Sequence, residues 1–169
     1  RGGITLVDEI YLGLSFDAWL VQSQHADFLD LARAFPDTTL VLDHCGGPLG
    51  IGPYANRRDE VFATWRTSLQ AIARCPNVQI KLGGLGMHTL GFDFPRQARP
   101  PSSEALAQAW APYIETCVEA FGAQRAMFES NFPVDKGTCS YGVLWNAFKR
   151  IAAQYSADEQ AALFVRALR

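Results

Sequence analysis

The sequence has no Cys-x-x-Cys pair and no run of about 18 apolar residues, the length that a membrane-spanning helix requires. Its four cysteines (Cys45, Cys75, Cys117 and Cys139) lie far apart, which argues against a zinc ribbon, a redox motif or a disulfide framework and is compatible with reduced thiols in a cytoplasm. The formal net charge is only −2, so the chain lacks the basic surface that binds nucleic acid or anionic membranes. We therefore expect a cytoplasmic protein with neither of these partners.

The N-terminal residues show neither a charged segment followed by an apolar core nor an initiator methionine. The first absence argues against a secretory signal, and the second suggests a processed or incomplete chain. With 169 residues, 49% of them hydrophobic, the chain is large enough to bury a core, and we expect a single domain over residues 1–169. A Gly-x-Gly-x-x-Gly turn after a strand is also missing, which disfavours a doubly wound nucleotide-binding domain.

The most informative segment runs from Leu40 to Pro48. Its first three residues are apolar β-formers, followed by Asp43, His44 and then a turn with two glycines and a proline. Such a run is typical of a short strand buried on both faces, and open α/β sheets and βα-barrels carry their chemistry at the carboxyl ends of such strands. The alternative is structural: Asp43 caps the turn and a backbone carbonyl satisfies His44.

Hydrophobic periodicity predicts four strand–helix units. The expected strands cover residues 14–21, 40–42, 78–82 and 126–130, and the expected helices cover residues 24–35, 56–75, 102–111, 112–121, 144–151 and 156–168. Asn56, Ser102 or Ser103, and Ser156 are the expected N-caps, and Pro112 is expected to start a second helix. Asp17 in the first strand is either a buried acid or a break. Alternation of this kind indicates an α/β fold with a parallel sheet and right-handed crossovers.

Each expected strand ends in polar residues or glycines, and parallel strands bring these ends to one rim of the sheet. The ends are Gln22–Gln24, Asp43–His44, Lys81 with Gly83, and Ser130–Asn131. Four polar strand ends on one rim indicate an active site more strongly than any single residue does.

The segment from Leu85 to Pro101 has no hydrophobic period, and we expect it to be a lid, a binding loop or disordered. Two phenylalanines, Phe92 and Phe94, argue against plain disorder. His88 lies in this segment and is expected to be a solvated loop histidine.

Three segments resemble the amidohydrolase-related family of metal-dependent hydrolases and lactonases. They are Leu42-Asp43-His44-Cys45-Gly46, Ile80-Lys81-Leu82-Gly83-Gly84-Leu85 and Arg125-Ala126-Met127-Phe128-Glu129-Ser130-Asn131-Phe132-Pro133-Val134. The resemblance implies a (β/α)₈ TIM barrel, of which these four units would be the C-terminal half. It also implies hydrolysis of a lactone, amide or similar bond in a small, anionic molecule.

The resemblance also implies roles for individual residues. His44 is similar to the family's barrel histidine, which binds a metal or polarises the substrate carbonyl, and Asn131 stands where the family usually has an aspartate that activates water. Lys81 corresponds to a strand-end lysine, and together with Asp43 and Ser130 it is expected to bind substrate. The implied cofactor is a divalent metal such as zinc, although a metal-independent reaction is the alternative.

The sequence departs from the family pattern in two ways. The His-x-His pair of the first barrel strand is absent, and the chain is about 80 residues shorter than a typical barrel of ~250 residues. Asn131 cannot accept a proton at neutral pH, so the general base is expected to be Asp135 or Asp43. The alternative to a hydrolase is a truncated, non-catalytic half-barrel that only folds or forms a homo-oligomer.

Overall fold

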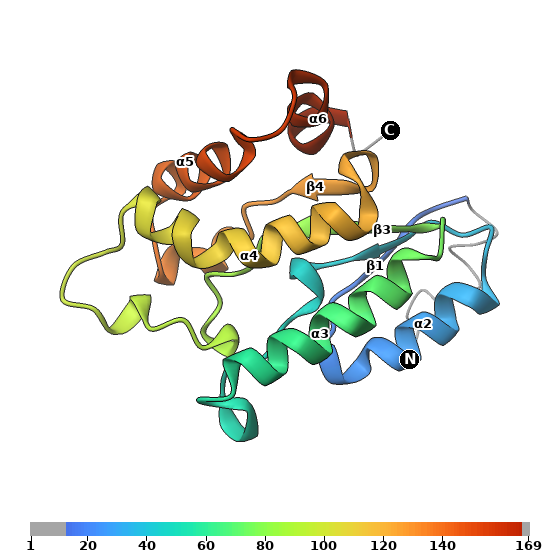
Figure 1. Ribbon diagram of the computed structural model, residues 1–169, viewed down its shortest axis with the longest axis horizontal. Coiled ribbons are helices and arrows are strands. Elements are labelled where there is room, and N and C mark those ends of the chain that lie inside the picture. Colours follow the sequence, from blue (N-terminus) through green and yellow to red (C-terminus); the bar gives the residue numbers. More distant parts are fainter. Residues whose placement is uncertain (1–12, 167–169) are drawn as a thin grey trace.

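The computed structural model describes residues 13–166, which form a four-stranded parallel sheet covered by helices (Figure 1). The strands are β1 (Phe16–Ala18), β2 (Leu40–Leu42), β3 (Val78–Leu82) and β4 (Ala126–Phe128), and they lie side by side in chain order. This arrangement confirms the predicted α/β fold and places all four carboxyl ends on one rim.

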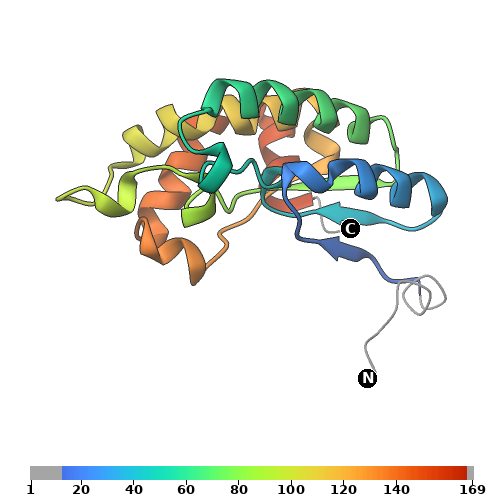
Figure 2. The same cartoon turned by 90° about the horizontal axis from the view of Figure 1, so that it is seen from below.

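The helices follow the strands as predicted. They are α2 (His25–Ala34), α3 (Arg58–Ala73), α4 (Ser103–Phe121), α5 (Tyr141–Ala152) and α6 (Ala157–Ala161), which continues as a π-helical turn over Ala162–Arg166. Figure 2 shows α2 and α3 together on one side of the strands. Within residues 13–166, no helix is long and apolar enough to span a membrane.

Side-chain alternation in β3 explains how the sheet faces its helices. Val78, Ile80 and Leu82 are fully buried in the core, whereas Gln79 and Lys81 point to the opposite face and are only half-buried. Asp17 of β1 is neither a buried acid nor a break in the strand. It pairs in register with Val41. Its exposed carboxylate contacts Lys81 on the face of the sheet to which Gln79 and Lys81 point.

The expected strand over residues 14–21 is too long: only Phe16–Ala18 pair with β2. A ladder cannot extend beyond its partner, and β2 has three residues before the chain turns at Asp43. The helix expected from Asn56 begins instead at Arg58, because Asn56 takes a left-handed conformation with φ of 62°. The Ser102 cap and the capping box of Ser156 and Glu159 are confirmed, and Leu168 lies outside the described residues.

The prediction of a second helix starting at Pro112 is wrong, because α4 runs unbroken from Ser103 to Phe121. An interior proline removes one backbone hydrogen bond and costs a helix about 3 kcal/mol. The apolar stripe of α4 outweighs this cost, since its side chains on both sides of the proline, from Leu106 and Trp110 to Phe121, are buried in the same core.

Arg125 joins the end of α3 to β3 and β4 through hydrogen bonds to backbone carbonyls. Its guanidinium donates to the carbonyls of Ala73 at 2.9 Å, Cys75 at 3.0 Å and Val78 at 3.1 Å. These oxygens lie between the last turn of α3 and the first residue of β3. One side chain therefore fixes the connection that sets the position of β3 in the sheet.

We predict that Arg125→Met, which keeps the apolar stem and removes the donors, lowers the free energy of unfolding by about 2 kcal/mol, the usual cost of losing hydrogen bonds from a charged group. Urea unfolding followed by circular dichroism measures this difference. Arg57→Met is the matched control because Arg57 is exposed and, among the described residues, pairs only with Glu60 and the carbonyl of Pro53. Equal stability of the two variants would contradict the proposed connection.

Candidate active site

His44 and Glu129 meet above the end of β3, although they follow β2 and β4, which are not neighbours. The Glu129 carboxylate oxygen Oε1 accepts a hydrogen bond from the backbone N–H of His44 at 3.1 Å and also contacts the ring nitrogen Nδ1. The structural alternative for this segment is therefore wrong. The imidazole is held by a carboxylate rather than a carbonyl, and Asp43 makes no side-chain cap to the turn.

Two glycines make this meeting possible. A Cβ atom on Gly83 would overlap Glu129, and one on Gly84 would lie 2.6 Å from Cβ and Cγ of His44. Gly84 also has a φ of 67°, a left-handed conformation that side chains rarely adopt. The Gly83-Gly84 pair after β3 thus leaves the space that the two side chains from the flanking strands occupy.

The turn that carries His44 has a strained backbone, which two buried side chains stabilise through contacts with its carbonyl groups. His44 and Cys45 have φ angles of 56° and 53°, which non-glycine residues seldom adopt. The buried Trp65 ring donates its Nε1–H to the Cys45 carbonyl at 2.8 Å, and His25 Nε2 lies 2.8 Å from the Gly46 carbonyl. Trp65 therefore both packs in the core and fixes the turn.

The charges around His44 favour its protonated form. Burial of the ring opposes protonation, but the hydrogen bond and charge of Glu129, together with the charges of Asp43 and Asp135, outweigh this effect and raise the pKa of His44 above its usual value. The imidazole is only 15% exposed. It lies in a negatively charged, partly desolvated environment.

Lys81 lies between two carboxylates on the face of the sheet opposite Val78, Ile80 and Leu82. Its Nζ is 2.7 Å from Oδ2 of Asp17 and 2.9 Å from Oδ1 of Asp43. Partial burial lowers the pKa of Lys81, but the two acids outweigh this effect and the pKa is raised. The cluster as a whole carries one more negative than positive charge.

Asn131 and Asp135 form the third polar group at this rim. Asn131, left-handed with φ of 49°, donates its Nδ2–H to Oδ1 of Asp135 at 2.9 Å. Asp135 is fully buried, and its Oδ2 has no hydrogen-bond partner in residues 13–166. Burial raises the pKa of Asp135 to about 6, against the opposing effects of the Asn131 hydrogen bond and the His44 charge.

The structure thus gathers most of the predicted residues, with one addition. Asp43, His44, Lys81, Asn131 and Asp135 all lie at the carboxyl ends of the strands. Ser130 lies there too, and within residues 13–166 its hydroxyl accepts a hydrogen bond from the nearby N–H of Phe132. Sequence reasoning missed Glu129. It follows three buried residues of β4 as Asp43 follows three of β2, and this shared pattern of an acid directly after a buried strand could have identified it.

A metal ion was the cofactor implied by the resemblance, with His44 as a ligand. A zinc site needs three or four protein ligands, yet residues 13–166 contain no group of three or more His, Cys, Asp or Glu side chains placed to hold one. These residues therefore do not form a complete zinc site by themselves, and we assign no step of the chemistry to a metal.

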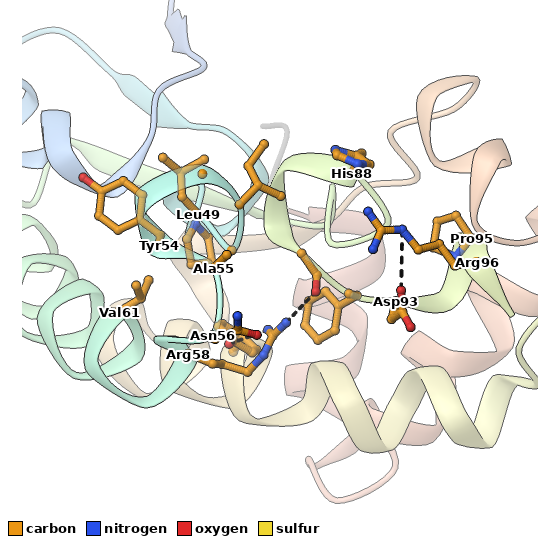
Figure 3. Close-up of a pocket in the computed structure, with 17 residues that line it drawn as sticks. Leu49, Tyr54, Ala55, Asn56, Arg58, Val61, His88, Asp93, Pro95 and Arg96 are labelled. Carbon is orange, nitrogen blue, oxygen red and sulfur yellow. Dashed lines mark hydrogen bonds and ion pairs between the residues drawn. The ribbon is translucent and has the colours of Figure 1, made fainter.

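A cavity of about 650 Å³ lies between the loop after β2 and the segment after β3 (Figure 3). Arg58 forms part of its wall: the guanidinium lies 4.3 Å from the centre of the Phe92 ring and donates to the Tyr113 hydroxyl and the Gly91 carbonyl. The segment over residues 85–101 is thus one wall of this cavity, with His88 exposed as expected. None of the polar strand-end residues lines the cavity, so we place the chemistry at His44.

Comparison with known proteins identifies relatives along nearly the whole chain. The amidohydrolase family model matches residues 11–169. The protein y4mH of Sinorhizobium fredii is 41% identical over 90% of this chain and 44% of its own length, and an L-fucono-1,5-lactonase of Burkholderia multivorans is 32% identical over 87% of this chain and 51% of its own length. The chain thus spans about half the length of the curated relatives it matches.

Solved structures agree with this assignment. The crystal structure of an amidohydrolase from Burkholderia multivorans with bound zinc superposes with a TM-score of 0.79 at 28% identity, covering 94% of this chain and 52% of that one. An amidohydrolase 2 from Bifidobacterium longum, at 18% identity and a TM-score of 0.64, shares the fold. These neighbours are TIM-barrel proteins, and the four strand–helix units match about half of such a barrel, as predicted.

We predict that Gly84→Ala destabilises the fold by about 2–4 kcal/mol, because the added methyl group meets His44 and left-handed backbone is costly for alanine. Urea unfolding gives the change in the free energy of unfolding. Gly142→Ala, in α5, is the control because an added Cβ meets nothing within 4 Å. If Gly84→Ala were as stable as this control, the close approach of the His44 side chain to Gly84 would be contradicted.

We predict that Asp135 makes the protein less stable as the pH rises from about 4 to 6. Because its pKa of about 6 in the folded state exceeds the ordinary value of 3.8, the folded state binds the proton more tightly, and this stabilisation is lost above the folded pKa. Asp135→Asn should therefore gain on the order of 3 kcal/mol relative to the wild type between pH 4 and pH 7. Urea unfolding across this pH range measures the gain. A matching gain in Asp27→Asn, which removes an exposed carboxylate of α2, would assign the effect to net charge instead.

Proposed function

Because this chain belongs to the amidohydrolase family, we propose that it provides catalytic residues of a hydrolase that opens the ring ester of a small lactone. Two of its relatives are named L-fucono-1,5-lactonase, at 32% and 29% identity. The observation that carries the proposal is the imidazole of His44 held by Glu129 at the carboxyl end of the strands, near enough to Asp135, the hydrogen-bond partner of Asn131, for the two charges to interact. Hydrolysis of an ester needs a positioned water and a group that takes its proton, and this rim carries an amide suited to the first task and an imidazole suited to the second.

Asn131 positions the water. Its amide N–H is committed to Asp135, which leaves the amide oxygen to accept a hydrogen bond from a water molecule. Asp135 is buried behind it and keeps Asn131 in this orientation. Asp135 was one of the two candidate bases, but its burial favours this supporting role over direct contact with the attacking water.

His44 takes the proton of that water. Its Nδ1 faces Glu129, so the other ring nitrogen, Nε2, is the one available to the reacting molecules. Asp43, the second candidate base, is committed to Lys81. After attack on the lactone carbonyl, the imidazolium returns the proton to the leaving ring oxygen, and the ring opens to a hydroxy acid.

The Lys81 cluster favours a neutral lactone rich in hydroxyl groups over the anionic substrate that the resemblance implied. The charge of Lys81 is already balanced by Asp17 and Asp43, so no positive charge is left over for a substrate carboxylate. Carboxylate oxygens accept hydrogen bonds from sugar hydroxyls, and Asp17 is half-exposed on this face.

We predict that the protein carrying this chain hydrolyses L-fucono-1,5-lactone faster than the dianionic lactone 2-pyrone-4,6-dicarboxylate. We also predict that His44→Ala lowers kcat for the sugar lactone by about 10²- to 10⁴-fold, the usual contribution of a general base. Acid release followed with a pH indicator measures both. Arg57→Ala, an exposed substitution at the N-cap of α3, should retain activity.

Each outcome of this assay has a definite meaning. Undiminished turnover by His44→Ala would refute the role of His44. Preference for the dianion would refute the proposal that the Lys81 cluster favours a neutral lactone. If the wild type hydrolyses no lactone, the non-catalytic half-barrel is favoured. Size-exclusion chromatography then shows whether it forms the homo-oligomer expected of that alternative.

A further inference from the structure

We propose that Glu129 is a positioning residue that fixes His44 in one tautomer, with the proton on Nδ1 and the lone pair on Nε2. The catalytic consequence rests on the lactonase function proposed above, whereas the tautomer itself does not. An ionised carboxylate only accepts hydrogen bonds, so the ring nitrogen that faces Glu129 must carry the hydrogen. A neutral imidazole with its hydrogen on Nδ1 has its lone pair on Nε2.

The contacts of Glu129 hold the ring as well as the proton. A single oxygen, Oε1, is shared by the backbone N–H of His44 and by Nδ1 of its ring, which fixes the side chain relative to its own backbone. The left-handed backbone of His44 is uncommon and persists only where its surroundings determine it. Gly83 and Gly84 supply the space for both side chains. The turn at His44 therefore has a backbone contact and a side-chain contact with Glu129, and both fix the orientation of the ring.

The other carboxylates at this rim are not free for this role. Asp43 is paired with Lys81, and Asp135 is buried with Asn131.

The chain contains an internal control for this assignment. Nε2 of the buried His25 lies 2.8 Å from the carbonyl oxygen of Gly46, and a carbonyl only accepts hydrogen bonds. The proton of neutral His25 must therefore be on Nε2, the opposite tautomer to that of His44. With three histidines in the sequence, His25, His44 and His88, the two tautomers can be compared in one spectrum.

The test is ¹⁵N NMR of the histidine side chains in the protein carrying this chain, at about pH 9.5, roughly three units above the ordinary histidine pKa. We expect His44 to show a protonated Nδ1 and an unprotonated Nε2, and His25 to show the reverse. The variant Glu129→Leu should lose the fixed tautomer at His44 and leave His25 unchanged. A protonated Nε2 at His44 in the wild type, or an unchanged His44 signal in Glu129→Leu, overturns the proposal.

Kinetics test the positioning role separately. Glu129→Gln keeps the shape of the side chain but offers an amide that can donate as well as accept, so it should lower kcat for lactone hydrolysis about 10²- to 10⁴-fold with KM nearly unchanged. Glu129→Asp should restore part of this loss because the carboxylate is retained. Equal activity of Glu129→Gln and the wild type overturns the positioning role. Since the NMR result needs no substrate, absence of any lactone turnover by the wild type refutes the proposed function and not the tautomer.

Discussion

The meeting of His44 and Glu129 across the end of β3 is the interaction on which the arrangement of this rim depends. The two residues follow strands that are separated by a third, and the space between them exists only because that third strand ends in two glycines. The strained turn at His44 is held in turn by Trp65 and His25, which bind the carbonyls of the next two residues. The left-handed backbone of His44, the lack of a Cβ atom at the two glycines and the buried ring donors therefore act together to place one imidazole.

Four acids near this rim occupy three kinds of environment, and the environment decides what each can do. Glu129 contacts His44, Asp43 and Asp17 share Lys81, and Asp135 is buried against Asn131. Burial keeps the proton on Asp135 up to a pH of about 6, while the exposed Asp17 remains open to solvent. The same functional group thus contacts an imidazole, pairs with a lysine or lies buried against an amide.

Much of the fold follows from the sequence because strands and helices are specified by local hydrophobic periods. The buried run before Asp43, the alternation in β3 and the capping box at Ser156 each correspond to an element in the structure. The exception at Pro112 is instructive. A local rule predicted a helix boundary there, but the apolar stripe on both sides of the proline packs into one core, and tertiary burial outweighed the local cost.

Local patterns specify the order of strands and helices, and they indicate that Asp43, His44, Lys81 and Asn131 lie at strand ends on one rim. Which of these groups touch follows from the packing of the elements: Glu129, 85 residues away in the chain, holds His44, and Asp135 is buried against Asn131. The difference is one of range along the chain. Periodicity reports which face of its own element a residue occupies, whereas contacts between the ends of different strands depend on how those elements pack and on where glycines leave room.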